Sequence, residues 1–362
     1  MAPNRKPGQQ PQVITLKEVA HHLGLTPGTV SAVLNDAPSA RSIPQETKNR
    51  IHAGAKELNY RPNFFARSLR NKRTYTIGVI VAEIGDTYGA SVVSGIEAYL
   101  RQKDYFFLTV VHRHKPELLD RYSQLLSERG VEGFITVDTT IHEAPGLPTV
   151  AVAGHKKLKG VTNIVLDHHR AAFLALSHLK DLSHKHIAVL RGHPHSADSQ
   201  DRFNAICEVA EQLGIGIDSD LTIHIDLDDP TPQLGYPFAK QLLARNKPFT
   251  ALFAYNDISA IGAIRAFQEQ GLRVPQDISV MGFDDIPGAA FHLPSITTVR
   301  QPLIRMGQVA AQTLLERIEN SQEYPEEIAI EPELVIREST AAAREVERQT
   351  NVLPDPVSAG RR

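Results

Sequence analysis

The sequence predicts a multidomain fold: an all-α helix-turn-helix domain, followed by an α/β core of two doubly wound parallel-sheet subdomains. Short helical patterns with capping residues fill residues 13–60. From Thr74 onward, short β-branched runs alternate with longer helical patterns, which is typical of a parallel sheet covered by helices. The chain has 362 residues, of which 41% are hydrophobic, so it can bury more than one core.

The helix-turn-helix lies roughly between Thr15 and Asn35, and its first helix is marked by its caps. Thr15 and Glu18 have the spacing of a capping box, in which each side chain bonds the other residue's backbone N–H. Apolar residues then recur on one helical face, and Gly24 is expected to end the helix.

The second helix follows after a short turn. Thr26 is a good N-cap, and Pro27 occupies the first helical position, where its missing N–H costs nothing, so this helix should run to about Leu34. A third helix should start near Pro44 and stop before Pro62, because a proline disfavours helical backbone in the residue before it.

The core is predicted from its alternating strands and helices, which over some 260 residues suggest two subdomains rather than one. The predicted strands are Tyr75–Val81, Phe106–Val111, Gly133–Val137, Thr149–Val152, His186–Leu190, Thr222–Asp226, Ala251–Ala254 and Ile278–Gly282. Helices are predicted around Ser91–Leu100, Arg170–Leu182, Phe203–Leu213 and Ser259–Gln270. The expected organisation is a disordered tail at 1–12, the helix-turn-helix domain at 13–60, a linker at 61–73, the core at 74–340 and a flexible tail at 341–362.

Charge is divided unevenly along the chain. Residues 1–73 contain 12 Lys and Arg against 4 Asp and Glu, a balance of +8, and the remaining residues contain 27 against 37, a balance of −10. A basic segment joined to an acidic body is suited to binding a polyanion such as DNA. The alternative is a solvated basic tail with no partner.

Several function classes lack their sequence signals. No stretch approaches the ~18 apolar residues of a membrane helix, and the first twelve residues lack the apolar core of a secretory signal, so we expect no membrane association and a cytoplasmic location. No glycine-rich phosphate loop, G-x-S-x-G elbow or H-E-x-x-H motif is present. We therefore expect no enzyme, no cofactor and no metal, and Cys207 is expected to be a small core residue.

The segments TLKEVAHHLGLTPGTVSAVLND, ELNYRPNFFARSLRNKRTYTIGVIV, HIAVLRG, YNDISAIGAIRAFQEQGLRVPQDISVMGFDDI and PSITTVRQP resemble the lactose repressor (LacI/GalR) family of bacterial transcription regulators. The resemblance extends from Ile14 to Ser339. It implies a hinge helix within 61–73 and a periplasmic-binding-protein-like core whose two lobes, with the chain crossing between them, close on a small effector. It further implies a nucleoid-associated repressor that binds an approximately palindromic operator as a homodimer, with a tetramer also open.

Two rival functions share parts of this pattern. A secreted solute receptor would have the same core but would need a signal peptide and no basic helix-turn-helix. A sugar-modifying enzyme on a similar sheet would need a nucleophile or base motif. The sequence has neither a signal peptide nor such a catalytic motif, and the regulator is the favoured function.

The resemblance places the base-facing positions of the second helix at Pro27, Gly28 and Ala32, and phosphate contacts at Thr29 and Ser31. The lactose repressor has tyrosine, glutamine and arginine at the three base-facing positions, so this helix offers almost no side chain for direct readout. Pro27 and Gly28 could equally be helix-start residues with no role in reading bases. The DNA contacts predicted in this domain are Thr15, Leu16, Thr26, Pro27, Gly28, Thr29, Ser31, Ala32, Asn35 and Arg41.

Two further features could supply the missing specificity. The loop Ala37–Ile43 is a few residues longer than is usual in the family and carries Arg41, for which an ordinary solvated arginine is the alternative. In the hinge, Leu69 occupies the position at which the family inserts a leucine into the minor groove and kinks the duplex; an unrelated linker is the alternative. The hinge contacts predicted from the resemblance are Asn63, Ala66, Arg67, Leu69 and Arg70.

The effector site is expected at the carboxyl ends of the core strands, where ligands bind in doubly wound sheets. The resemblance implies that Arg202, which we expect to open a helix, and Asn256 and Asp284 bond ligand hydroxyls or a charged group, and that Tyr88 stacks on the ligand. Helix capping is the favoured role of two neighbouring acids, Asp257 and Asp285. A carbohydrate-like effector is expected, with a sugar, a sugar phosphate and an organic acid all open.

Overall fold

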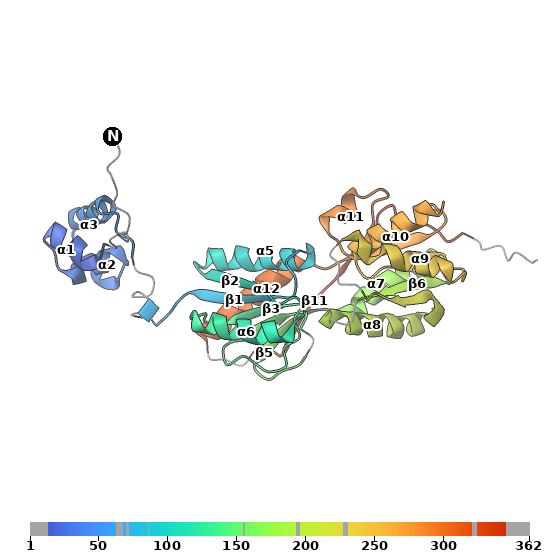
Figure 1. Cartoon of the computed structure of the whole chain (residues 1–362), viewed down its shortest axis with the longest axis horizontal. Helices are drawn as coiled ribbons and strands as arrows, with labels where there is room; N and C mark the ends of the chain where they lie inside the picture. Colours follow the sequence, from blue (N-terminus) through green and yellow to red (C-terminus); the bar gives the residue numbers. More distant parts are fainter. Residues whose placement is uncertain are drawn as a thin grey trace, which may run out of the picture. The chain divides into compact units, whose positions relative to one another are not determined.

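The fold was analysed in a computed structural model of the chain. The structure describes residues 14–62, 68–69, 72–85, 87–154, 156–192, 196–226, 231–320 and 324–344. These residues fall into two compact units, which meet in sequence between Thr74 and Tyr75 and are described separately (Figure 1).

The N-terminal unit is a cluster of short helices around a small apolar core. The predicted caps are confirmed: Thr15 and Glu18 form a reciprocal capping box, and Gly24 ends the first helix with a φ of 63°. Thr26 caps the second helix, and Pro27 is its first residue. Val19, Val30, Ile51 and other apolar side chains from each α-helix form the core. The elements are α1 (Leu16–Leu23), α2 (Pro27–Leu34), the 3-10 helix η1 (Pro38–Ser42) and α3 (Gln45–Glu57).

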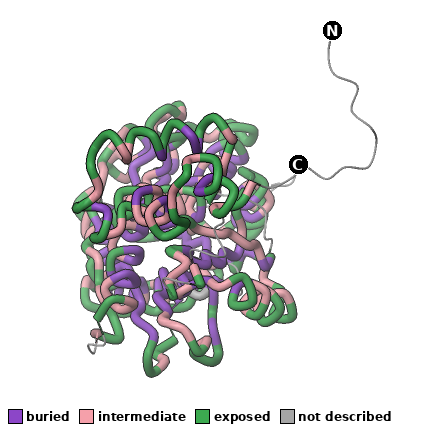
Figure 2. The backbone as a smooth tube through the Cα atoms, turned by 90° about the vertical axis from the view of Figure 1, so that its left-hand side faces the viewer, coloured by how far each residue is buried: buried purple, intermediate pink, exposed green. Residues whose placement is uncertain are grey.

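The second unit contains two six-stranded sheets, each covered by helices on both faces. Most of the interior strands are buried along their whole length, and Figure 2 shows exposed residues mainly on the outer turns of the chain. The doubly wound architecture predicted from the sequence is therefore confirmed. Each sheet with its helices is called a lobe below, the first lobe being the one that contains β1.

The first lobe has the strand order β11-β5-β4-β3-β1-β2, with parallel pairing throughout. Helices α5 and α12 cover one face, and α6 packs on the other (Figure 1). The α5 and α12 backbones approach closely at two glycines, since a Cβ on Gly95 would lie 2.1 Å from the carbonyl oxygen of Ile304 and one on Gly307 2.1 Å from that of Val92. The elements of this lobe are β1 (Thr76–Val81), α5 (Thr87–Gln102), β2 (Phe106–Val111), α6 (Pro116–Glu128), β3 (Phe134–Val137), β4 (Thr149–Val152), β5 (Val161–Leu166), α12 (Leu303–Glu319) and β11 (Glu327–Ile330).

The second lobe has the strand order β12-β10-β9-β8-β6-β7, parallel except for its antiparallel edge strand β12. Helices α7 and α8 pack against one face and α9 and α10 against the other. Its elements are α7 (His168–Asp181), β6 (Ile187–Arg191), α8 (Ala197–Leu213), η2 (Ser219–Leu221), β7 (Thr222–His224), η3 (Pro232–Leu234), α9 (Tyr236–Ala244), β8 (Ala251–Phe253), α10 (Asp257–Glu269), β9 (Ser279–Asp284), α11 (Pro287–Phe291), β10 (Thr297–Arg300) and β12 (Glu333–Val335).

The chain passes between the lobes after β5, after β10 and between β11 and β12. The first strand of each lobe lies between the next two strands of that lobe in sequence. Thus β1 lies between β2 and β3, and β6 lies between β7 and β8. The carboxyl ends of these strand pairs are the switch points at which doubly wound sheets bind ligands. Candidate site residues should therefore follow β1, β3, β6 and β8.

Candidate DNA interface and effector site

The start of α2 presents an exposed surface without ionisable groups. Pro27 and Gly28 are both exposed. A Cβ placed on Gly28 would meet only the Thr26 hydroxyl oxygen, at 3.7 Å, so the fold itself does not require glycine there. Because glycine weakens a helix interior, a need from outside the domain, such as close approach of a DNA backbone, would account for it.

The hydroxyl groups near this surface are already engaged within the domain. The Thr26 Oγ1 accepts from the Thr29 backbone N–H at 3.2 Å and lies 2.9 Å from the Thr29 Oγ1. The Asn35 amide donates to the Ser31 carbonyl oxygen at 2.7 Å and lies 3.3 Å from the Ser31 hydroxyl. The Thr29 hydroxyl can still take part in a second bond, such as one to a phosphate.

The other predicted contacts of this unit differ in exposure. Ala32 is half-buried against the helical core, which leaves only part of its side chain for a base. Leu16 is likewise half-buried, while the Thr15 side chain is exposed and bonded to Glu18. Arg41 lies in η1 and is exposed, and it makes no hydrogen bond or ion pair with any residue that the structure describes.

The predicted hinge lies mostly outside the described residues. Asn63, Ala66, Arg67 and Arg70 belong to the part of the chain that is not described. Leu69 is described, adopts helical backbone together with Ser68, and exposes 84% of its surface. A leucine so exposed has no packing role within its own unit.

In the second unit, residues that follow strands of both lobes lie within one electrostatic cluster. Tyr88 comes from the first turn of α5, after β1, and Asp138 directly follows β3 in the first lobe. Arg202 and Asp284 come from the second lobe, and the charges of Asp138, Asp284 and Arg202 all influence the Tyr88 hydroxyl. Asp138 and Asp284 both adopt positive φ, 45° and 105°, a strained conformation for a non-glycine residue that is often found at functional sites.

Arg202 is the centre of the cluster on the second-lobe side. It pairs with Asp198 one turn earlier on α8, and its Nη1 donates to the Tyr255 carbonyl oxygen at 2.7 Å. Its guanidinium lies 3.8 Å from the Phe283 ring centre. Burial disfavours the charged guanidinium, but Asp198 beside it raises the pKa of Arg202 overall. The Asp198 carboxylate is also 2.8 Å from the His168 Nε2, so this ion pair is fixed from two sides.

Tyr88 and Asp284 are the polar groups best placed to meet a ligand. The Tyr88 hydroxyl is buried and has no hydrogen-bond partner among the residues that the structure describes. Burial, and then the carboxylates of Asp198 and Asp138, raise the pKa of Tyr88 well above its usual value. Burial likewise raises the pKa of Asp284 well above its usual range, against the opposing effect of Arg202, while Gln301 donates to the Asp284 carboxylate at 2.6 Å.

Three expectations for this region are corrected by the structure. The N-cap of α10 is Asn256, whose Oδ1 accepts from the Ser259 N–H at 2.9 Å, which leaves the amide group of Asn256 for a ligand. Asp257 and Asp285 are not caps: Asp257 accepts from the Ile286 N–H at 2.8 Å, and Asp285 binds two arginines, Arg300 and Arg337. Arg202 does not open its helix, because α8 begins at Ala197.

Several members of the cluster were not predicted from the sequence. Asp198 had a usable signal, since it precedes Arg202 by four residues and i,i+4 pairs meet on a helix. Asp138 follows a predicted strand and could have been found by the argument that found Asp284. Gln301 follows β10, a strand that was not predicted from the sequence, and Tyr255 acts through its backbone carbonyl, which no sequence pattern reveals.

A helix-turn-helix unit joined to a two-lobed core with a buried polar cluster defines a DNA-binding regulator with a small-molecule site. No helix among the described residues has the length and apolar character needed to span a bilayer. The sequence comparisons agree with this class. The family described as "Bacterial regulatory proteins, lacI family" matches residues 15–63, and "Periplasmic binding protein-like domain" matches residues 176–340.

Similar proteins extend the match over nearly the whole chain. The HTH-type transcriptional repressor PurR of Haemophilus influenzae is 31% identical over 336 residues, 90% of this chain and 98% of the relative. A structure of the lac repressor dimer bound to operator and the anti-inducer ONPF has a TM-score of 0.82 at 26% identity, covering 91% of this chain and all of that one. The complex of the transcriptional regulator CelR with cellobiose has a TM-score of 0.66 at 26% identity, covering 90% and 99%.

The chain therefore belongs to the lacI family of bacterial regulatory proteins. It is a DNA-binding transcription regulator under small-molecule control and not an enzyme. The family and the fold class expected from the sequence are both confirmed.

Proposed function

We propose that this chain is a repressor that binds an approximately palindromic operator as a homodimer, and that a neutral, carbohydrate-like effector controls its affinity from the polar cluster of Tyr88, Arg202 and Asp284. The similarity to PurR repressors and to a lac repressor dimer held on its operator supports the first part. Such a regulator acts in the bacterial cytoplasm, on the nucleoid.

The single observation that carries the effector proposal is the buried cluster contributed by both lobes. It contains one arginine, already paired with Asp198, and two further carboxyl groups, Asp138 and Asp284. A second anion would meet no unpaired cation there, which disfavours a sugar phosphate or an organic acid. A neutral polyol can donate hydroxyl protons to the carboxylates and accept from Tyr88, whose hydroxyl has no described partner.

Relatives of the same fold carry ligands of this chemistry. One is the CelR complex with cellobiose, and another is a regulator from Enterococcus faecium with bound ribose, which matches with a TM-score of 0.66 at 27% identity. In this proposal, Asn256 contributes its free amide, and effector binding changes how the lobes close, which biases the hinge toward or away from DNA.

The effector proposal is tested by titrating the purified protein with neutral sugars, sugar phosphates and small organic acids in a calorimeter. At least one neutral sugar should bind the native chain, and Asp284→Asn should weaken that binding by about tenfold, the loss of one hydrogen bond. Asp181→Asn, an exposed acid at the end of α7, is the matched control and should bind normally. Binding only by anionic compounds, or equal loss in both variants, would overturn the proposal.

The operator proposal is tested by selecting bound DNA from a random pool, with and without the effector. A palindromic consensus should emerge, and Leu69→Ser should bind it more weakly and bend it less than the native chain does, because no leucine wedges the central step. Ile84→Ser, which also removes an exposed apolar side chain but lies in the core unit, is the control and should retain bending. A consensus without two-fold symmetry would refute the dimeric operator.

A further inference from the structure

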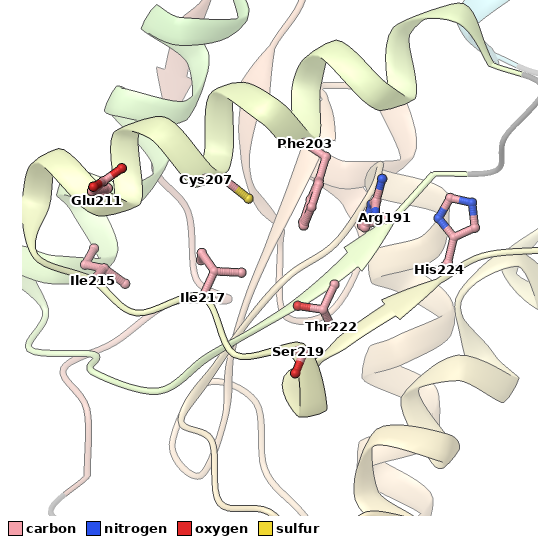
Figure 3. A pocket seen from close by; sticks show the side chains of 9 residues that line it. All are labelled: Arg191, Phe203, Cys207, Glu211, Ile215, Ile217, Ser219, Thr222 and His224. Atoms are coloured by element: carbon pink, nitrogen blue, oxygen red, sulfur yellow. The ribbon is translucent and has the colours of Figure 1, made fainter.

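A pocket lies on α8, lined by residues outside the polar cluster. Its volume is about 640 Å³, within the range of small-molecule sites. Figure 3 shows its walls: Phe203, Cys207 and Glu211 point from α8 toward residues of β6, β7 and the segment that connects α8 to β7. None of the effector residues proposed above lines it.

Two neighbouring faces of helix α8 contribute to the two sites. Phe203, Cys207 and Glu211 follow one another at intervals of four, so they share one helical face. Asp198 and Arg202, also four apart, lie on a neighbouring face and enter the buried cluster. The same helix therefore supplies one wall of each site.

Arg191 gives this pocket a cation for which the described residues supply no counterion. Its guanidinium stacks on the Phe203 ring at 3.8 Å, and its Nη2 donates to the Gln200 Oε1 at 3.0 Å. Among the residues that the structure describes, its buried Nε has no hydrogen-bond partner and no carboxylate pairs with the side chain. Arg202, eleven positions later, differs in that a carboxylate, that of Asp198, pairs with its guanidinium. A half-buried arginine with most of its donors unused favours an anionic ligand.

The pocket is polar at its ends and apolar between them. Arg191 and His224 lie at one end, and Glu211 lies at the other (Figure 3). Glu211 follows Phe203 by eight residues, which corresponds to roughly 12 Å along α8. Phe203 and Ile217 form apolar walls between the two ends. A ligand that fits would place an anion near Arg191 and an apolar body toward Ile217.

We propose that this pocket binds a small monocarboxylate with an aromatic or branched apolar body, as a second ligand site of the regulator. The planar guanidinium fork matches a carboxylate, and the single cation balances a single negative charge. A phosphate dianion would need further charged donors, and burial and the neighbouring Arg191 lower the pKa of His224, which disfavours its charged form. A dicarboxylate would bring its second anion toward Glu211. This proposal does not rest on the effector role proposed for the polar cluster.

Cys207 provides a direct reporter of occupancy, because it is the only cysteine in the chain and lines the pocket. The probe is 3-phenylpropanoate, and its amide is the uncharged control of the same shape. The rate of Cys207 alkylation by N-ethylmaleimide is measured in the full-length protein. At about ten times its Kd, the acid should slow alkylation roughly tenfold, since protection follows 1 + [L]/Kd, and the amide should give little protection. Saturation-transfer NMR of both compounds measures binding independently of thiol reactivity.

Arg191→Gln should abolish protection by the acid, whereas Arg121→Gln, an exposed arginine on α6, should leave it intact. Cys207→Leu fills the pocket and should remove the NMR signal of the bound acid, with unchanged circular dichroism showing that the fold is retained. The proposal is overturned if the acid neither protects Cys207 nor gives an NMR signal, if the amide binds as well as the acid, or if Arg191→Gln binds like the native chain.

Discussion

The DNA-binding unit and the core place charge in opposite ways. The exposed start of α2 presents Pro27 and Gly28, with no ionisable side chain, while Arg202, Asp198 and Asp284 are all buried in the core. Salt weakens contacts between exposed protein groups and DNA. Without base-reading side chains, such contacts depend on the position of the DNA backbone and on the shape of the duplex. Buried charges are held in fixed geometry and depend on every partner being present. The core should therefore respond strongly to single substitutions, and the DNA-binding unit weakly.

The largest effect is expected from Arg202→Met. Removing one member of a buried ion pair leaves Asp198 without its cation, so the free energy of unfolding should fall by about 3–5 kcal/mol. Urea denaturation followed by circular dichroism measures the loss. The control is Arg265→Met, which breaks an i,i+4 pair with Glu269 on the exposed face of α10 and should leave stability unchanged. Similar losses in both variants would remove the contrast between buried and exposed charge.

A pH effect of nearly the same size is expected from Asp257, which is fully buried at the start of α10. Burial raises the pKa of Asp257 from 3.8 to about 7. The folded chain thus holds a proton that the unfolded chain has released, so the contribution is favourable at low pH and is lost as pH rises toward 7. Between pH 5 and pH 8, this costs roughly 3 kcal/mol.

Asp257→Asn removes that titration while an amide oxygen can still accept from the Ile286 N–H. The difference in unfolding free energy between native and variant chains should therefore shift in favour of the variant as pH rises from 5 to 8, as urea titrations at each pH would record. The exposed Asp181→Asn should run parallel to the native chain. Parallel curves for Asp257→Asn as well would show that this carboxyl titrates normally.

A smaller effect with a distinctive sign is expected from Tyr88→Phe. Because the buried Tyr88 hydroxyl has no described partner, its removal should raise the stability of the unliganded protein by about 1–2 kcal/mol. The same change should weaken effector binding about tenfold, the loss of one hydrogen bond. Thermal unfolding and calorimetry on the same samples measure both. Lower stability together with unchanged effector affinity would assign Tyr88 to the core instead of the site.

Local patterns were sufficient to predict the helix-turn-helix and most of the core strands. The caps at Thr15, Gly24 and Thr26 depend on neighbouring residues only, and the structure confirms them. The strands β5, β10, β11 and β12 were not predicted. Strand β5, VTNIVL, has Asn163 in a buried interior, and β11 is a short edge strand whose residues alternate between exposed and half-buried. Their strand state depends on neighbours that lie far away in sequence.

The effector cluster divides in the same way into locally and non-locally determined roles. Asp284 was found because an acidic residue at a strand end has a local signature. The i,i+4 spacing of Asp198 and Arg202 is also local, but the contact of Asp198 with His168 from another helix could not be read from the sequence. The roles of Asp257 and Asp285 were misjudged for the same reason. Aspartate near a helix start predicts a cap, but the partners of both residues, the Ile286 N–H and the Arg300 and Arg337 side chains, come from distant segments.

The smallest effect is expected from Arg41→Ala, in the exposed 3-10 helix η1. Ala40 is buried and anchors this segment, so loss of the neighbouring side chain should not disturb the domain. If Arg41 contacts a phosphate, the slope of log affinity against log salt concentration should become shallower by about 1 per bound arginine, with similar loss for all sequences. Fluorescence anisotropy with the selected operator and a scrambled duplex across a salt series measures this, and Arg121→Ala in the core is the control. An unchanged slope would mean that Arg41 is only solvated. A loss of affinity confined to the operator would mean that Arg41 reads a base. In that case, α2 would not be the main source of sequence discrimination.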